Sequence, residues 1–275
     1  MKKYTLYIRK ATQMIKKIIK SALIKILDFF GYEVSFQRKG YSNLENVDKY
    51  IWQPYFRPNQ KMLLYFEGLR KSNMEWSDNY YKQLRFYSLQ QMVHHVLRQE
   101  LSGDFVECGV WKGHSAYMIS SIISENEFSG VFHIFDSFEG GLSDKVDKDK
   151  NIRGELTQQE INEGSNIFHS TEDEVKSCLS GFNFTSLYKG WIPSRFNEIE
   201  DKQFQFVHID VDLYEPTWES LNFFYPKLVD NGVIVCDDYG LSQFPGAKKA
   251  VDEFLNNNNF KMCYEVPMGG CFIIK

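Results

Sequence analysis

The chain has 275 residues, 43% of them hydrophobic and 16% aromatic. This is enough to bury the core of one α/β domain with an appendage, and it excludes a largely disordered protein. The formal net charge of −4 is unevenly distributed, because residues 1–27 carry eight Lys or Arg and no acid, while the rest has 24 bases against 36 acids. The chain after residue 27 therefore has a net negative charge. This charge would repel the phosphates of a nucleic acid, which argues against nucleic acid as a partner. The five cysteines show no CxxC pair and no metal-ligand spacing, which favours a reducing, cytoplasmic compartment.

Residues 1–40 are predicted to form a basic amphipathic helix and a linker. Apolar side chains recur at helical spacing from Ile15 to Phe30, and lysines surround this stripe. The lysines also interrupt the apolar run, so neither a signal peptide nor a membrane span is expected. Residues 1–30 could make a peripheral contact with an anionic membrane surface. The favoured alternative is that the stripe packs on the main domain or on a second copy in a homo-oligomer.

Residues 41–101 are predicted to form a helical cap, which is rich in tyrosine and contains Pro54 and Pro58. Its last part should be an amphipathic helix that packs on a sheet and is capped by Ser77 or Asp78. The apolar positions of this helix are Leu84, Leu89, Val93, Val96 and Leu97. The aromatic residues before it are expected either to fill a core or to shape a substrate pocket.

From residue 102 to 275, short apolar runs alternate with helical patterns. This rhythm predicts an α/β domain with a doubly wound, mostly parallel seven-stranded sheet, whose ligands bind outside the carboxyl ends of its strands. The last two runs, KMCYEVP and GCFIIK, flank a Met-Gly-Gly turn and predict an antiparallel hairpin. Residues 140–172 are charged and turn-rich, so they are expected to be an insertion over the active edge.

The first strand of this domain ends in a glycine-containing turn, which runs from Glu107 to Ser115 and reads ECGVWKGHS. Its glycines let the backbone approach a ligand closely, and the following helix start offers free N–H groups. The glycine spacing differs from the GxGxxG of dinucleotide-binding proteins, which disfavours an NAD-dependent oxidoreductase. Glu107 instead favours a cofactor with a cationic amine beside a carboxylate. At the end of the second strand, Asp136 could accept both hydroxyls of a ribose.

Three carboxylates follow two later apolar runs. Asp210 ends the run FVHID, and Asp237 and Asp238 end the run GVIVCDD. Parallel strands bring such residues to one edge, where three carboxylates form a site for a hard cation such as Mg²⁺. Asp212 is a further candidate ligand or base. Asp210 is the favoured general base, and His208 on the same strand face is the alternative. Strand-end aspartates could instead cap the next helix.

The glycine-containing turn and the two runs that end in aspartate resemble the motifs of a known family. Further matches are FDSFEGGL (which has one extra glycine), KGW and FPGAKKAVDEF. The family is the macrocin O-methyltransferase type of S-adenosylmethionine-dependent methyltransferases, which methylate sugar hydroxyls. The resemblance covers about residues 103–256 and implies the Rossmann-like fold of class I methyltransferases. The residues that it assigns to the cofactor are Glu107, Gly109, Gly113 and Ser115 around the methionine part, Asp136, Ser137 and Phe138 around ribose and adenine, and Gly190 and Trp191 on the adenine side. The residues that it assigns to Mg²⁺ are Asp210, Asp237 and Asp238.

The residues and the resemblance together predict an S-adenosylmethionine-dependent, Mg²⁺-dependent O-methyltransferase that acts on a sugar hydroxyl. A bound Mg²⁺ lowers the pKa of a coordinated hydroxyl, and its open positions suit a vicinal diol. The catechol-type enzymes are expected to place a lysine three residues after the first metal aspartate, where this chain has Leu213. The acceptor could be a glycan of polysaccharide biosynthesis, a nucleotide sugar or a glycosylated metabolite. The alternatives are methylation of a small phenolic or macrolide-type metabolite, and a non-catalytic scaffold with the cofactor fold.

Overall fold

The computed structural model describes residues 60–150, 168–267 and 269–275, all within one compact unit that spans residues 55–275. The helices are α3 (Gln60–Lys71), α4 (Tyr80–Arg98), α5 (His114–Ser124), α7 (Glu172–Cys178), α8 (Tyr214–Lys227) and α9 (Pro245–Asn257), with short 3-10 turns η1 (Glu75–Ser77), η2 (Asp147–Asp149) and η3 (Phe196–Ile199). The strands are β1 (Asp104–Cys108), β2 (Phe132–Asp136), β3 (Thr185–Lys189), β4 (Phe204–Ile209), β5 (Leu228–Cys236), β6 (Met262–Glu265) and β7 (Cys271–Ile274). Among these helices, none is long and apolar enough to cross a membrane.

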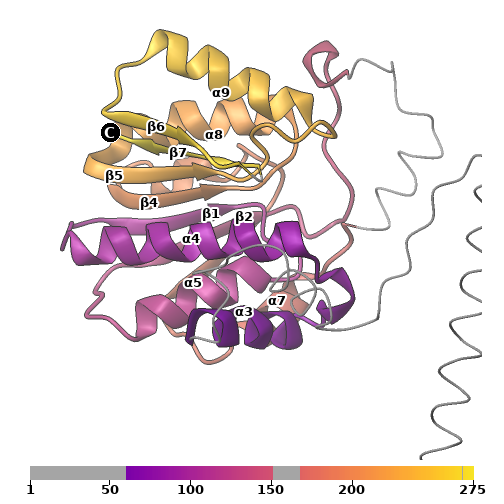
Figure 1. Cartoon of the computed structure of the whole chain (residues 1–275), viewed down its shortest axis with the longest axis vertical. Helices are drawn as coiled ribbons and strands as arrows, with labels where there is room; N and C mark the ends of the chain where they lie inside the picture. Colours follow the sequence, from indigo (N-terminus) through magenta and orange to yellow (C-terminus); the bar gives the residue numbers. More distant parts are fainter. Residues whose placement is uncertain (1–59, 151–167, 268) are drawn as a thin grey trace, which may run out of the picture. The chain divides into compact units, whose positions relative to one another are not determined.

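The strands form one seven-stranded sheet in the order β3-β2-β1-β4-β5-β7-β6 (Figure 1). Strands β1 to β5 pair in parallel, whereas β7 is antiparallel to both β5 and β6. The predicted doubly wound, mostly parallel sheet and its C-terminal hairpin are therefore confirmed. The strand order reverses direction between β1 and β4, which makes the carboxyl ends of these two strands the expected place for a ligand.

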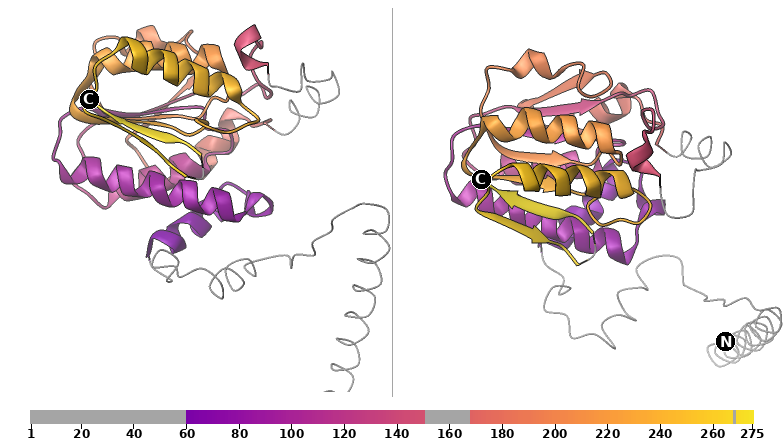
Figure 2. Two further views of the ribbon diagram at one scale, coloured as in Figure 1. Left: turned by 45° about the horizontal axis from the view of Figure 1, so that its top comes forward. Right: turned by 90° about the horizontal axis from the view of Figure 1, so that it is seen from above.

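Helices cover both faces of the sheet (Figure 2). Helices α3, α4 and α5 pack on one face, and α8 and α9 pack on the other. Successive side chains of a strand point to opposite faces, so Phe105 of β1 lies in the first core and Val106 lies in the second. All residues of β4 are buried, as expected for a central parallel strand covered on both sides.

The described part of the predicted helical cap forms α3 and α4, which pack on α5. Helix α4 buries three of the predicted apolar positions, Leu89, Val93 and Val96. The predicted cap on Ser77 or Asp78 is wrong, because Asn79 is the N-cap and its Oδ1 accepts the N–H of Lys82 at 3.0 Å. The carboxylate of Asp78 instead accepts a hydrogen bond from the Tyr65 hydroxyl at 2.9 Å. A long-range partner thus takes the side chain that the local pattern assigned to the cap.

The predicted amino-terminal helix in residues 1–40 lies outside the described residues, as does the middle of the predicted insertion, residues 151–167. Before that gap, Asp149 of η2 is hydrogen-bonded to α8, one of the two helices that cover the second face of the sheet. Its Oδ1 accepts the N–H of Tyr214, the first residue of α8, at 2.8 Å. Gly246 of α9 lies so near that a Cβ at this position would be 1.7 Å from the same oxygen. This end of the insertion is therefore fixed beside the end of β4.

Asp104, the first residue of β1, ties β1 to β2. Its Oδ1 accepts the N–H of Val131 at 2.8 Å, and its Oδ2 lies 3.1 Å from Nε2 of His133. Burial by itself raises the pKa of Asp104, but the hydrogen bonds from His133 and Val131 outweigh burial and lower the pKa below its ordinary value. The charged form of this carboxylate therefore stabilises the fold.

We expect the substitution Asp104→Asn to lower the free energy of unfolding at pH 7 by about 1 kcal/mol. Because the pKa of Asp104 is lower in the folded chain, its contribution is present above the unfolded pKa of about 3.9 and is lost as pH falls through the folded pKa. Urea unfolding between pH 7 and pH 2 should therefore show the gap between wild type and variant closing below about pH 4. The exposed Asp201→Asn is the control; an equal effect of both substitutions would contradict this role for Asp104.

Candidate active site

One cavity of about 890 Å³ lies at the carboxyl ends of the central strands. Its wall includes residues that follow β1, β2, β4 and β5, the first turn of α4, and residues 240–244 before α9. The glycine-containing turn after β1 and the carboxylates after β4 and β5 are therefore parts of the same wall. This is the switch point that the strand order indicates.

The glycine-containing turn is in direct contact with the end of β4. Gly109 has a φ of +83°, and a Cβ built on it would lie 1.8 Å from the carbonyl oxygen of Asp210. Asp136 at the end of β2 holds the other side of the turn, because its Oδ2 accepts the N–H groups of Val110 and Trp111 at 2.9 and 3.0 Å. A Cβ at position 109 would overlap the backbone at Asp210, so the turn after β1 can pack against the end of β4 only with glycine there.

Most of the residues predicted to hold the cofactor line the cavity: Gly109, Ser115, Asp136, Ser137 and Trp191. The others, Glu107, Gly113, Phe138 and Gly190, are not part of its lining. Gly113 is the N-cap of α5 and has a φ of +88°, while the N–H of Phe138 donates to Oδ1 of Asp136 at 2.9 Å. Gly113, Phe138 and Gly190 have positive φ and lie outside the strands, in the segments next to the lining residues, whereas Glu107 lies within β1. Their roles in cofactor binding stay predictions.

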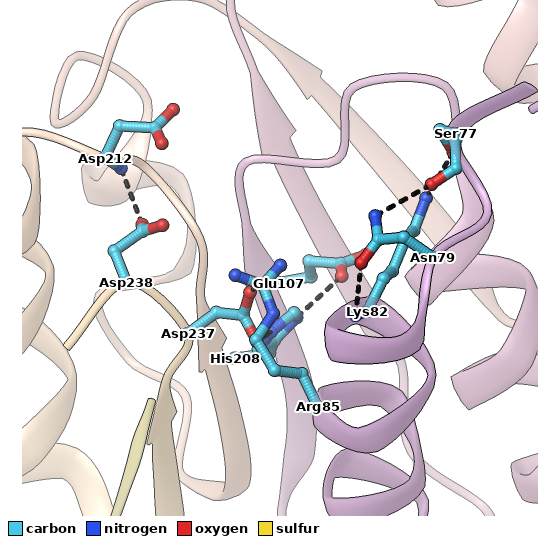
Figure 3. Close-up of polar contacts among 9 residues, drawn as sticks. All are labelled: Ser77, Asn79, Lys82, Arg85, Glu107, His208, Asp212, Asp237 and Asp238. Atoms are coloured by element: carbon cyan, nitrogen blue, oxygen red, sulfur yellow. Dashed lines mark hydrogen bonds and ion pairs between the residues drawn. The ribbon is translucent and has the colours of Figure 1, made fainter. Parts of the chain in front are cut away.

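Four closely spaced carboxylates follow β4 and β5, from Asp210, Asp212, Asp237 and Asp238. Burial, and then the charge of Asp237, raises the pKa of Asp210 to about 7. Burial and the charge of Asp210 raise the pKa of Asp212 to about 8. Burial and Asp212 also raise the pKa of Asp238, and its Oδ2 accepts the N–H of Asp212 at 2.7 Å (Figure 3). This edge thus carries more negative charge than its surroundings compensate.

His208 and Glu107 lie beneath this edge, opposite each other on β4 and β1. Nδ1 of His208 is 2.8 Å from Oε1 of Glu107, and its Nε2 is 3.9 Å from Oδ1 of Asp237 (Figure 3). Burial alone lowers the pKa of His208, but Asp237 and Glu107 outweigh burial and raise it to about 10. The imidazole is therefore protonated at neutral pH and lies between two carboxylates. It does not line the cavity.

Arg85 of α4 is a functional candidate that the sequence analysis missed. Its Nη2 lies 2.7 Å from Oδ2 of Asp237, and the two side chains are 20% and 7% exposed. Burial alone raises the pKa of Asp237, but Arg85 and His208 lower it below its ordinary value. The signal was present, because Arg85 is next to Phe86 and four residues before Leu89, both on the buried stripe of α4. A basic residue on that stripe indicates a buried acidic partner.

These residues fit a divalent cation. A cation at this edge would relieve the mutual repulsion that raises the pKa values of the carboxylates, and Mg²⁺ prefers oxygen ligands of this kind. One possible ligand atom each from His208, Asp210 and Asp237 lies within 4.8 Å of the others, but a protonated imidazole has no lone pair for a metal, so only the two aspartates of this group are candidate ligands. Asp238, the third residue of the predicted metal set, is not in that group and faces the Asp212 N–H. Arg85 occupies Oδ2 of Asp237.

The alternative that these aspartates cap the following helices has no support in the described structure. The N-caps of α8 and α9 are Leu213 and Phe244, and neither makes a side-chain capping bond. The first N–H of α8 is bonded by Asp149, which comes from another part of the chain. Asp210, Asp212 and Asp238 therefore line the cavity, whereas Asp237 is paired with Arg85 outside its lining.

Comparisons with known proteins bear on this site and fold. A family model described as macrocin-O-methyltransferase (TylF) matches residues 64–267. A demethyldecarbamoylnovobiocin O-methyltransferase from Streptomyces niveus is 25% identical over 240 residues, which cover 84% of this chain and 83% of that protein. An 8-demethyl-8-(2,3-dimethoxy-alpha-L-rhamnosyl)-tetracenomycin-C 4'-O-methyltransferase from Streptomyces olivaceus is 24% identical over 162 residues, covering 57% and 60%. The solved structure of the O-methyltransferase NovP has a TM-score of 0.59 and 22% identity, over 76% of this chain and 88% of that one.

The contact between Gly109 and Asp210 can be tested by Gly109→Ala, with Gly240→Ala as a matched control. Both glycines have a φ of +83°, but a Cβ at Gly240 meets nothing within 4 Å. Gly240→Ala should therefore lower the free energy of unfolding only by the left-handed backbone cost, about 1–2 kcal/mol. Gly109→Ala should cost about 2 kcal/mol more, because backbone atoms must move apart. Urea unfolding measures both, and equal losses would contradict the close approach.

The ion pair between Arg85 and Asp237 can be tested by Arg85→Met. Removing one partner leaves a buried charge uncompensated, so the free energy of unfolding should fall by about 3 kcal/mol. Adding Asp237→Asn to this variant should recover part of the loss, and the double-mutant cycle measures the coupling. Arg98→Met, at an exposed position in the last turn of the same helix, is the control. Additive losses in the cycle would show that the pair contributes nothing.

Proposed function

Since this chain belongs to the macrocin-O-methyltransferase family and is an O-methyltransferase, we propose that it transfers the methyl group of S-adenosylmethionine to a sugar hydroxyl with the help of Mg²⁺. One observation carries the proposal. A single cavity joins the turn held by Asp136 to the carboxylates of Asp210, Asp212 and Asp238. A methyl donor and an acceptor hydroxyl need to meet in one such enclosed space, because transfer depends on positioning.

The cofactor half of this proposal rests on the turn and on the end of β2. Gly109 lines the cavity and lets the turn pack against the backbone at Asp210, and Ser115 in the first turn of α5 contributes a hydroxyl to the wall. Asp136 lies at the carboxyl end of β2, and after accepting three backbone N–H groups its carboxylate keeps one lone pair on Oδ1, which could receive one ribose hydroxyl. Trp191 forms part of the wall and is fixed by the hydrogen bond from its Nε1 to Glu139 at 3.1 Å. It offers a flat surface for an adenine ring.

The acceptor half of the proposal rests on the carboxylates and on the relatives. The name of the Streptomyces olivaceus relative includes a rhamnosyl group, which favours a sugar as the acceptor class here. A sugar also presents neighbouring hydroxyls, which suit the open positions of a Mg²⁺ held by a few carboxylates. The residues that would hold this ion are Asp210 and Asp237, with Asp238 as the third candidate.

In the proposed reaction, bound S-adenosylmethionine supplies an electrophilic methyl group, and bound Mg²⁺ makes a coordinated hydroxyl more acidic. Asp210 takes the hydroxyl proton, because its carboxylate lies in the cavity wall beside the residues that would hold the ion. His208 does not compete for the proton, because it is already protonated between Glu107 and Asp237. Together with Arg85, its charge stabilises the ionised form of Asp237 instead. The backbone contact of Gly109 with Asp210 keeps donor and base at a constant separation.

The first test is calorimetric titration of S-adenosylmethionine and S-adenosylhomocysteine, with Mg²⁺ and with EDTA, combined with methyl-transfer assays on a panel of sugars. We expect cofactor binding that survives the double substitution Asp237→Ala, Asp238→Ala, because these residues are not in the cofactor half of the cavity. Methyl transfer should need Mg²⁺ and should fall by at least about 100-fold in the double variant. Circular dichroism checks that this variant is folded.

The exposed Asp201→Ala serves as the control in the same assays and should behave as wild type. Failure of the wild-type chain to bind either form of the cofactor would refute the choice of methyl donor. Full turnover in EDTA would refute the metal requirement while leaving the donor in place.

A further inference from the structure

Lys82, in the first turn of α4, presents a cation to the cavity. Its side chain is half-buried and forms part of the cavity wall. The Nζ donates to Oγ of Ser77 at 2.7 Å (Figure 3). It also lies 5.4 Å from the centre of the Phe86 ring. Ser77 is a neutral partner, and its own hydroxyl donates to the carbonyl of Met74. An ammonium group has three N–H donors, so two of them remain for another partner.

The charge of Lys82 is not balanced by a carboxylate within ion-pair distance among the residues that the structure describes. The other two cations of the cavity wall differ in this respect, because Arg85 is paired with Asp237 at 2.7 Å and Lys112 with Glu174 at 3.5 Å. Burial, and then the nearby charge of Arg85, lowers the pKa of Lys82 to about 8, although Asp210 is among the acids that oppose this change. The surroundings thus leave room for one more negative charge.

The ammonium group lies near a second feature that favours anions. Phe86, over which Nζ sits, is stacked on the ring of His114 with 4.2 Å between centroids. His114 is the first residue of α5, and the N-cap Gly113 provides no capping side chain. The N–H groups at a helix start carry partial positive charge. Ser115 in the same turn lines the cavity together with Lys82.

We propose that Lys82 binds the carboxylate of a ligand in this cavity, and that this ligand is the methionine part of the cofactor. The assignment rests on the proposed function, which supplies a ligand that carries such a carboxylate. Lys82 and the start of α5 would hold the carboxylate from two sides, with the hydroxyl of Ser115 beside it. In this arrangement the segment before β1 completes the cofactor site, and α4 contributes to both halves of the cavity through Lys82 and Arg85.

An anionic group on the acceptor, such as the diphosphate of a nucleotide sugar, is the other source of the same chemistry. The position of Lys82 favours the cofactor, because Phe86 and His114 connect it to the helix that follows the glycine-containing turn. The two sources can be separated with ligands that carry one anion and lack the other.

The test is calorimetric titration of S-adenosylhomocysteine and of its decarboxylated analogue, which keeps the amine, into wild type, Lys82→Met and Lys82→Arg. Hydrogen bonds to charged groups predict that Lys82→Met weakens S-adenosylhomocysteine about 10- to 100-fold. The same variant should change the affinity of the decarboxylated analogue by less than about twofold, because this analogue lacks the carboxylate that Lys82 is proposed to bind. Lys82→Arg keeps the charge and should retain most of the affinity.

Arg98→Met is the control, since it removes an exposed cation from the last turn of the same helix, outside the cavity wall. It should leave both affinities unchanged. Equal weakening of the two ligands by Lys82→Met, or no weakening of either, would overturn the assignment to the cofactor carboxylate. A nucleoside diphosphate glucose is then titrated into the protein loaded with S-adenosylhomocysteine; a loss confined to this ligand in Lys82→Met would assign the lysine to an acceptor anion. Wild-type protein that binds no S-adenosylhomocysteine would refute the proposed function itself, before any lysine variant is compared.

Discussion

The crowding of negative charge at the ends of β4 and β5 is the constraint on which the rest of this site depends. Neighbouring parallel strands bring Asp210, Asp212, Asp237 and Asp238 together because their carboxyl ends meet at one edge of the sheet. Carboxylates so close cannot all be ionised without compensating cations. The protein supplies two compensating cations from different layers. His208 comes from β4 within the sheet, and Arg85 comes from α4, which packs on the sheet. The packing of α4 on the sheet is therefore part of the electrostatics of the site.

A second constraint couples the two halves of the cavity. The backbone at Gly109 touches the backbone at Asp210, and the backbone after Gly109 is held by Asp136. A shift of the turn after β1 would thus move the end of β4 as well. Such coupling would suit the proposed transfer, in which the acceptor oxygen, the methyl carbon and the sulfur must be held in line.

Much of this arrangement could be predicted from the sequence, because it depends on local patterns. Strand and helix periods indicate the sheet, and chemistry-bearing residues at strand ends indicate the edge where a ligand binds. Arg85 and Asp149 were missed because each acts on a partner far away in the chain. Asn79 replaced the predicted cap for the same reason, since Tyr65 takes the carboxylate of Asp78. The protonation of His208 likewise depends on Glu107 and Asp237, which no local pattern places beside it.

The hydrogen bond from the first residue of α8 to Asp149 fixes the start of the insertion to the helix that follows β4. The chain is fixed to the catalytic edge just before residues 151–167, and it is fixed again at Thr171, which forms a reciprocal capping box with Glu174 at the start of α7. Between these two anchors, insertions and deletions would not shift the ends of β4 and β5. Natural selection could therefore vary the length or sequence of this segment while the carboxylates after β4 and β5 keep their positions.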